Sequence, residues 1–85
     1  MRFPEEINDD VLKRLRRLEG QIRGVQRLVD EGAECREIVH QLAAAKAALD
    51  RVGFRLVSAG LRHCGTGDAS SKEAAELEKL FMKLS

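Results

Sequence analysis

One stretch of thirty residues, Cys35 to Cys64, decides the fold: CREIVHQLAAAKAALDRVGFRLVSAGLRHC. Apolar or small side chains recur in it every three or four residues, at positions 35, 38, 42, 45, 49, 52, 56 and 59. This heptad-like spacing predicts one long helix over about 34–64 that packs against other helices along its length. Such a helix is about 45 Å long at ~1.5 Å per residue.

The residues before this stretch predict a second long helix. Apolar side chains fall at positions 11, 15, 18, 22, 25 and 29, which places them on one side of a helix over about 9–31. Asn8, Asp9 and Asp10 offer an N-cap, and Gly32 ends the run.

The residues after the stretch predict a short third helix. The segment GTGDASS interrupts the apolar pattern, and Ser70 with Glu73 fits a capping box that opens a helix over about 71–84. We therefore expect a single all-α domain over 1–85, a size that buries only a modest core. Two long helices and a short one cannot cover both apolar seams in a monomer, which favours a pair of hairpins packed as a four-helix bundle, in a symmetric dimer or a multiple of one.

The distribution of apolar residues indicates the cellular compartment. The N-terminus has no apolar targeting core, and no stretch approaches the roughly 20 apolar residues of a membrane span. We therefore expect a cytoplasmic protein without a membrane partner, whose two cysteines are kept reduced and are available for redox sensing or metal binding.

Cys35 and Cys64 share a face of the predicted helix, because their separation of 29 residues is about eight turns with a remainder near 20°. They lie roughly 43 Å apart along the axis, whereas a disulfide needs Cα atoms within about 7 Å. In an antiparallel dimer with its two-fold axis near residues 49 and 50, Cys35 of each subunit lies beside the partner subunit's Cys64, which gives one pair at each end of the dimer. The sequence thus predicts two inter-subunit dithiol sites. The alternative is two ordinary apolar core cysteines.

The net charge of +1 conceals a basic stripe along the two long helices. Residues 13–27 carry six Lys or Arg against Glu19 alone, and residues 36–64 carry five basic groups against two acidic ones. A symmetric oligomer would multiply the stripe into a surface that neutralises phosphates, although a solvated helix face is the ordinary alternative. The basic side chains assigned to DNA are Arg14, Arg16, Arg17, Lys46 and Arg51. No helix-turn-helix spacing, zinc finger or aromatic stacking motif accompanies them.

The segments RLRRLEGQIRGVQRLV, QLAAAKAALDRVG and LRHC resemble the copper-sensing repressor (CsoR/RcnR) family of small bacterial transcriptional regulators over nearly the whole chain. The resemblance implies an all-helical protomer, an antiparallel dimer and a dimer of dimers, that is, a homotetramer. An enzyme is not expected, because a dithiol reductase commonly carries CxxC and this sequence has no such motif. It also implies that the protein binds operator DNA when free of inducer and releases it when an inter-subunit site is occupied. Arg14 and Arg51 match basic residues of the family's DNA-binding face.

The inducer site departs from the copper-sensing pattern of one Cys at the start of the second helix and a His and a Cys one turn apart near its end. Cys35 and Cys64 match the two cysteines, but the His position is Gly60. This pattern is most similar to the persulfide-sensing branch, so we expect reactive sulfur species to cross-link the two thiols, with no cofactor required. Cys35, at a helix N-terminus beside Arg36, is the expected attacking thiolate and Cys64 the resolving thiol.

Two other inducers stay open. Cu(I) is soft and accepts two thiolates, so Cys35 and Cys64 could hold it without the imidazole, and Gly60→His should then raise Cu(I) affinity. Formaldehyde is the third alternative, because AEC at 33–35 resembles the formaldehyde-sensing branch, although that branch has a proline directly after Met1 and this chain has Arg2. The resemblance also implies that Glu76 couples the site to the rest of the protein.

Overall fold

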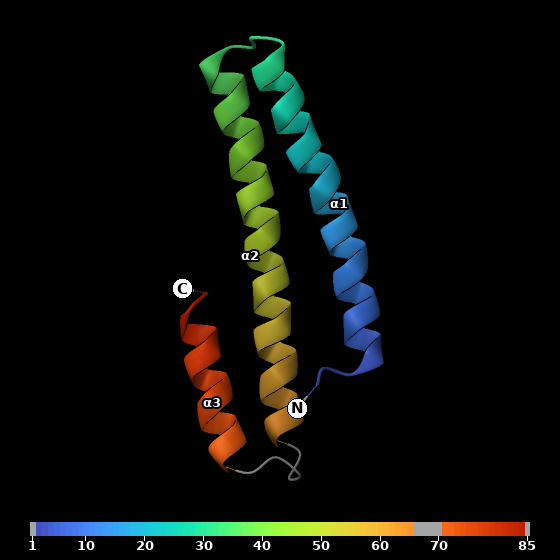
Figure 1. Ribbon diagram of the computed structural model, residues 1–85, viewed down its shortest axis with the longest axis vertical. Helices are drawn as coiled ribbons and strands as arrows, with labels where there is room; N and C mark the ends of the chain where they lie inside the picture. Colours follow the sequence, from blue (N-terminus) through green and yellow to red (C-terminus); the bar gives the residue numbers. More distant parts are fainter. Residues whose placement is uncertain (1, 66–70, 85) are drawn as a thin grey trace.

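Three α-helices form the described part of the computed structural model, which covers residues 2–65 and 71–84 (Figure 1). They are α1 (Glu5–Asp30), α2 (Cys35–Gly65) and α3 (Ser71–Met82). α1 and α2 form an antiparallel hairpin, and α3 lies along the C-terminal half of α2 on the side away from α1. The described residues contain no strand, and the predicted all-α class is confirmed.

α1 begins four residues before the predicted residue 9. Pro4 takes the N-cap position with φ −58° and ψ 150°, and its carbonyl oxygen accepts two backbone N–H groups of the first turn at 3.1 Å. The proline ring presets φ, and acidic side chains at Glu5 and Glu6 stabilise the positive end of the helix dipole. Asn8 and its two acidic neighbours therefore lie inside the helix instead of capping it.

The hairpin turn between α1 and α2 depends on Gly32, whose φ of +69° belongs to the left-handed region. The N–H of Ala33 donates to the carbonyl of Leu28 at 2.9 Å, and the N–H of Gly32 donates to the carbonyl of Val29 at 3.1 Å. This is the Schellman arrangement, in which a glycine ends a helix and satisfies its last carbonyl groups. The chain then reverses, and α2 starts at Cys35.

The single apolar seam predicted along α2 divides into two sets with a seven-residue period. Ala45, Val52 and Ala59 are buried within the chain, at 3–5% exposure. Leu42 and Leu49, with Cys35 in the same register, stay exposed, and the two leucines keep 55% and 54% of their surface. One set forms the core of the protomer, and the other has no packing partner among residues 2–65 and 71–84.

α3 packs on α2 through Leu77, which is 4% exposed, and Phe81. It ends at Met82, two residues before the predicted end, because residues 83 and 84 form a turn whose N–H groups bond to the carbonyls of Leu80 and Phe81 at 3.1 and 3.0 Å. Such three-residue bonds satisfy terminal carbonyl groups when a helix cannot continue. The predicted cap at Ser70 lies outside the described residues.

Within residues 2–65 and 71–84, no helix combines the length and the apolar character that a membrane crossing requires.

Candidate functional site

The two cysteines stand at opposite ends of one uninterrupted helix. Cys35 is the first residue of α2 and its side chain is exposed, while Cys64 falls in the last turn, where its side chain is outside the described part of the structure. α2 has 31 residues, so its axis is about 46 Å long at ~1.5 Å per residue. The thiols of one chain therefore cannot meet.

Gly60 lies on the same face of α2 as the two cysteines. On a helix of 3.6 residues per turn, positions 35, 42, 49, 60 and 64 fall within roughly 60° of one another. α3 covers this face at Gly60, which is buried. A Cβ atom at position 60 would lie 2.7 Å from Cζ of Phe81 and 3.0 Å from Cδ2 of Leu77, inside the ~3.5 Å at which carbon atoms pack.

The space beside Gly60 is thus filled by an aromatic ring that belongs to the same chain. A histidine at this position would have to displace Phe81 before its imidazole could face the thiols. The expectation that Gly60→His raises Cu(I) affinity did not include this obstacle, because the side chains of Phe81 and Leu77 fill the space that the imidazole would need.

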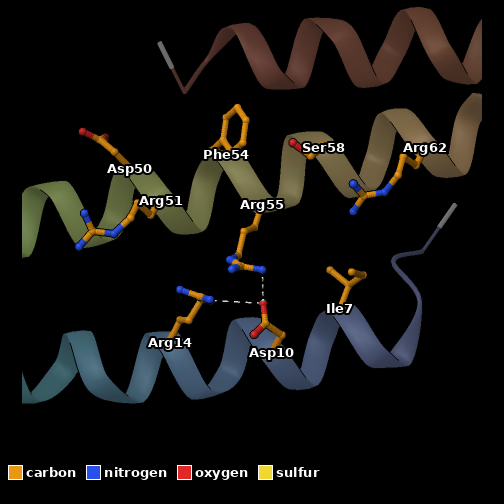
Figure 2. Close-up of a pocket in the computed structure, with 9 residues that line it drawn as sticks. All are labelled: Ile7, Asp10, Arg14, Asp50, Arg51, Phe54, Arg55, Ser58 and Arg62. Atoms are coloured by element: carbon orange, nitrogen blue, oxygen red, sulfur yellow. Dashed lines mark hydrogen bonds and ion pairs between the residues drawn. The ribbon is translucent and has the colours of Figure 1, made fainter.

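A basic groove runs between α1 and α2, on a different face from the cysteines. Its larger part is a cleft of about 700 Å³ near the N-terminal half of α1 (Figure 2). From α2 it is lined by a row with helical spacing, in which every third or fourth residue points to one side. The members of this row are Arg51, Arg55, Ser58 and Arg62.

α1 supplies the opposite wall of the groove with Ile7, Asp10 and Arg14. Figure 2 shows the carboxylate of Asp10 between two guanidinium groups. Its Oδ2 atom accepts from Nε of Arg14 at 3.3 Å and from Nη1 of Arg55 at 3.1 Å. The same carboxylate oxygen therefore binds Arg14, one turn further along α1, and Arg55 on α2, and the second contact joins the two helices.

The groove continues past Arg14 and Arg51 into a smaller pocket, which these two residues line together with Arg17 and Gln21. Oε1 of Gln21 is buried and has no hydrogen-bond partner among the described residues. Arg14 and Arg51 therefore stand at the junction of both parts of the groove, and Arg17 extends the basic lining along α1.

Three other side chains singled out from the sequence lie away from this groove. Arg16 and Lys46 are exposed and line neither of its two parts. Lys46 shares the face of α2 that carries the cysteines, by its helical position. Glu76 is exposed on α3, one residue before the buried Leu77.

Comparison with known proteins identifies the family. The profile of the metal-sensitive transcriptional repressor family matches residues 7–83. The chain belongs to this family. Its members are repressors and not enzymes, as predicted.

Named relatives of this repressor family include copper sensors. The chain is 33% identical over 82 residues to the copper-sensing transcriptional repressor CsoR of Bacillus subtilis, covering 88% of this chain and 81% of that one. It is 41% identical over 58 residues to the copper-sensing transcriptional repressor RicR of Mycobacterium tuberculosis, covering 68% of this chain and 60% of that one. The fold matches the crystal structure of the copper-sensing repressor CsoR with Cu(I) from Geobacillus thermodenitrificans, with a TM-score of 0.74, 35% identity, and coverage of 96% of this chain and 93% of that one.

Two features of the repressor were missing from the side chains assigned to a site from the sequence. Arg55 and Arg62 belong to the predicted basic stripe but were not among the side chains assigned to DNA, although positions 51, 55, 58 and 62 form one helical row along the groove. The contact between Phe81 and Gly60 could not be predicted from the sequence, because it joins two different helices and the spacing of residues along one helix does not reveal it.

Proposed function

We propose that the protein represses transcription in the cytoplasm as an antiparallel dimer, or a dimer of dimers, that binds operator DNA through the basic groove between α1 and α2. The exposed face of α2 supports self-association, because Leu42 and Leu49 keep more than half of their surface uncovered in a single chain. Two such faces, paired antiparallel, bring the apolar residues together and align Cys35 with the partner subunit's Cys64. Both ends of the pair then hold the same dithiol site.

We further propose that the inducer is a reactive sulfur species that acts on these two thiols. The observation that carries this proposal is the packing of Phe81 against Gly60, which leaves no space for an imidazole ligand at position 60 of α2. Two thiols are sufficient for covalent sulfur chemistry, because thiol–disulfide exchange needs an attacking and a resolving thiol but no third metal ligand.

The chemistry proceeds in two displacements. The Cys35 thiolate attacks the terminal sulfur of a persulfide donor, forms a new S–S bond and releases the donor as a thiolate. The thiolate of the partner subunit's Cys64 then attacks the Cys35 sulfur and expels hydrosulfide. The two cysteine sulfurs each lose one electron, and the sulfane sulfur gains both. A polysulfide donor leaves additional sulfur atoms in the bridge. The cross-link favours a dimer conformation whose basic groove no longer fits DNA.

Cu(I) is the second candidate inducer. It is supported by the copper-sensing relatives and by the similarity to a repressor crystallised with Cu(I). Cysteine thiolates are soft ligands that suit Cu(I), and Cys35 and the partner's Cys64 would supply two of them.

One experiment separates the two candidates. The reduced protein is treated with sodium tetrasulfide or with Cu(I), and intact mass and DNA binding are measured in parallel. Reactive sulfur sensing predicts a covalent dimer and loss of DNA binding after tetrasulfide. Release of DNA by Cu(I) with tetrasulfide inert would overturn the sulfur proposal and leave the copper candidate.

The groove assignment makes its own prediction. Arg14→Ala or Arg51→Ala should weaken DNA binding and reduce the slope of log affinity against log salt by about 0.9 for each phosphate that the arginine neutralises. Arg16→Ala is the matched control, since it removes the same charge from an exposed site that lines neither part of the groove and should have a smaller effect. Equal losses of affinity in all three variants would assign DNA binding to overall charge and not to the groove.

A further inference from the structure

Asp10 is an acidic residue in the middle of a surface that otherwise suits phosphate. The cleft between α1 and α2 is lined by four arginines and two aspartates, which gives it a net charge of +2. The carboxylate of Asp50 points away from α1, whereas that of Asp10 points between the guanidinium groups (Figure 2). Asp10 is therefore the anion that the cleft already holds.

The contacts of Asp10 are those that a phosphate oxygen would make. Oδ2 lies 3.3 Å from Nε of Arg14 and 3.1 Å from Nη1 of Arg55, so one anionic oxygen bridges the two helices. Guanidinium groups form the same charge-assisted bonds with carboxylate and phosphate oxygens. Among the described residues, Arg51 and Arg62 have no ion-pair partner and stay available on either side.

The ion pairs are exposed enough to exchange. The side chains of Asp10, Arg14 and Arg55 keep 41%, 31% and 48% of their surface in solvent. Solvent screens such pairs, and their net contribution to stability is small. A DNA phosphate can therefore replace the carboxylate without unfolding either helix, because the closely spaced phosphate charges of DNA attract the arginines strongly.

We propose that the Asp10 carboxylate occupies the position of a DNA backbone phosphate in the free protein and competes with DNA for Arg14 and Arg55. This inference rests on the proposed DNA-binding function and adds Arg55 to the phosphate contacts. Asp10 lowers affinity for all sequences alike, because a phosphate contact carries no base information. The carboxylate keeps non-specific binding weak, and it pairs with the arginines again when the protein leaves DNA.

The test uses the whole chain and two duplexes, one selected by the wild-type protein from a randomised pool and one of unselected sequence. Asp10→Asn keeps the size of the side chain and removes its charge. It should bind both duplexes roughly tenfold more tightly near 0.1 M salt, because no carboxylate then competes with the phosphate for the two arginines. Helix content, measured by circular dichroism, should not change.

Asp9→Asn is the matched control, since Asp9 is exposed, adjacent and outside the cleft. It makes the same change in net charge and should alter affinity far less. If Asp10→Asn binds no more tightly than Asp9→Asn, or binds more weakly than wild type, the competition proposal is overturned. If the wild-type protein enriches no duplex from the pool and does not bind the unselected one, the proposed DNA-binding function itself fails, and the two failures are thereby distinguished.

Discussion

Cys35→Ser and Cys64→Ser should each abolish release of DNA by tetrasulfide while leaving DNA binding itself unchanged. Each variant lacks one thiol of every inter-subunit pair, so no bridge forms in either homodimer. Both positions lie at the ends of α2, away from the basic groove. The effect is therefore a complete loss of response with little change in affinity, as measured by fluorescence anisotropy of a labelled duplex before and after tetrasulfide.

Mixing the two serine variants gives the decisive result. A heterodimer of Cys35→Ser and Cys64→Ser contains one intact site, made from the remaining thiol of each chain, and one site without any thiol. Co-refolded variants should therefore regain one cross-link per dimer and a partial response to tetrasulfide. A mixture as inert as the separate variants would contradict the inter-subunit pairing, because only a pairing between chains can be complemented in this way.

Gly60→His alone should destabilise the protein and fail to increase Cu(I) affinity. A Cβ atom at this position already collides with Phe81 and Leu77, so the substitution overpacks the contact between α2 and α3. Overpacking of this kind costs about 1–3 kcal/mol. Thermal denaturation followed by circular dichroism measures the loss of stability, and competition with a Cu(I) chelator measures the affinity.

Phe81→Ala added to Gly60→His should restore part of the stability and raise Cu(I) affinity above that of the wild type. Removal of the ring opens space for the imidazole, so the two changes are less costly together than the sum of their separate costs. Phe81→Ala alone is the control, and it should lose stability without any gain in Cu(I) binding. A gain in Cu(I) affinity by Gly60→His without the second change would show that the ring does not block this position.

The fold was predictable because its determinants are local. The apolar period of positions 35–59 is sufficient to define α2, and Gly32 alone marks the end of α1. The start of α1 was missed because three polar residues resemble a cap as well as Pro4 does. These three residues lie inside α1, where the backbone N–H groups already donate to backbone carbonyls and need no side-chain cap.

The candidate site was predictable only in part because it depends on contacts between helices. Spacing on one helix placed Cys35 and Cys64 on a common face, and it predicted basic residues along α1 and α2. It could not reveal that Asp10 reaches Arg55 on the next helix. Arg16 and Lys46 were assigned to DNA because of their charge, and their helical positions turn both away from the lining of the groove.

The unbroken length of α2 has a consequence for how a cell could use this protein. On the proposed pairing between subunits, each copy carries halves of two different sensors and no complete one, because α2 holds its two thiols at opposite ends. A single copy would then be unresponsive at any concentration of inducer. The response threshold would depend on the concentration of repressor as well as on the concentration of inducer.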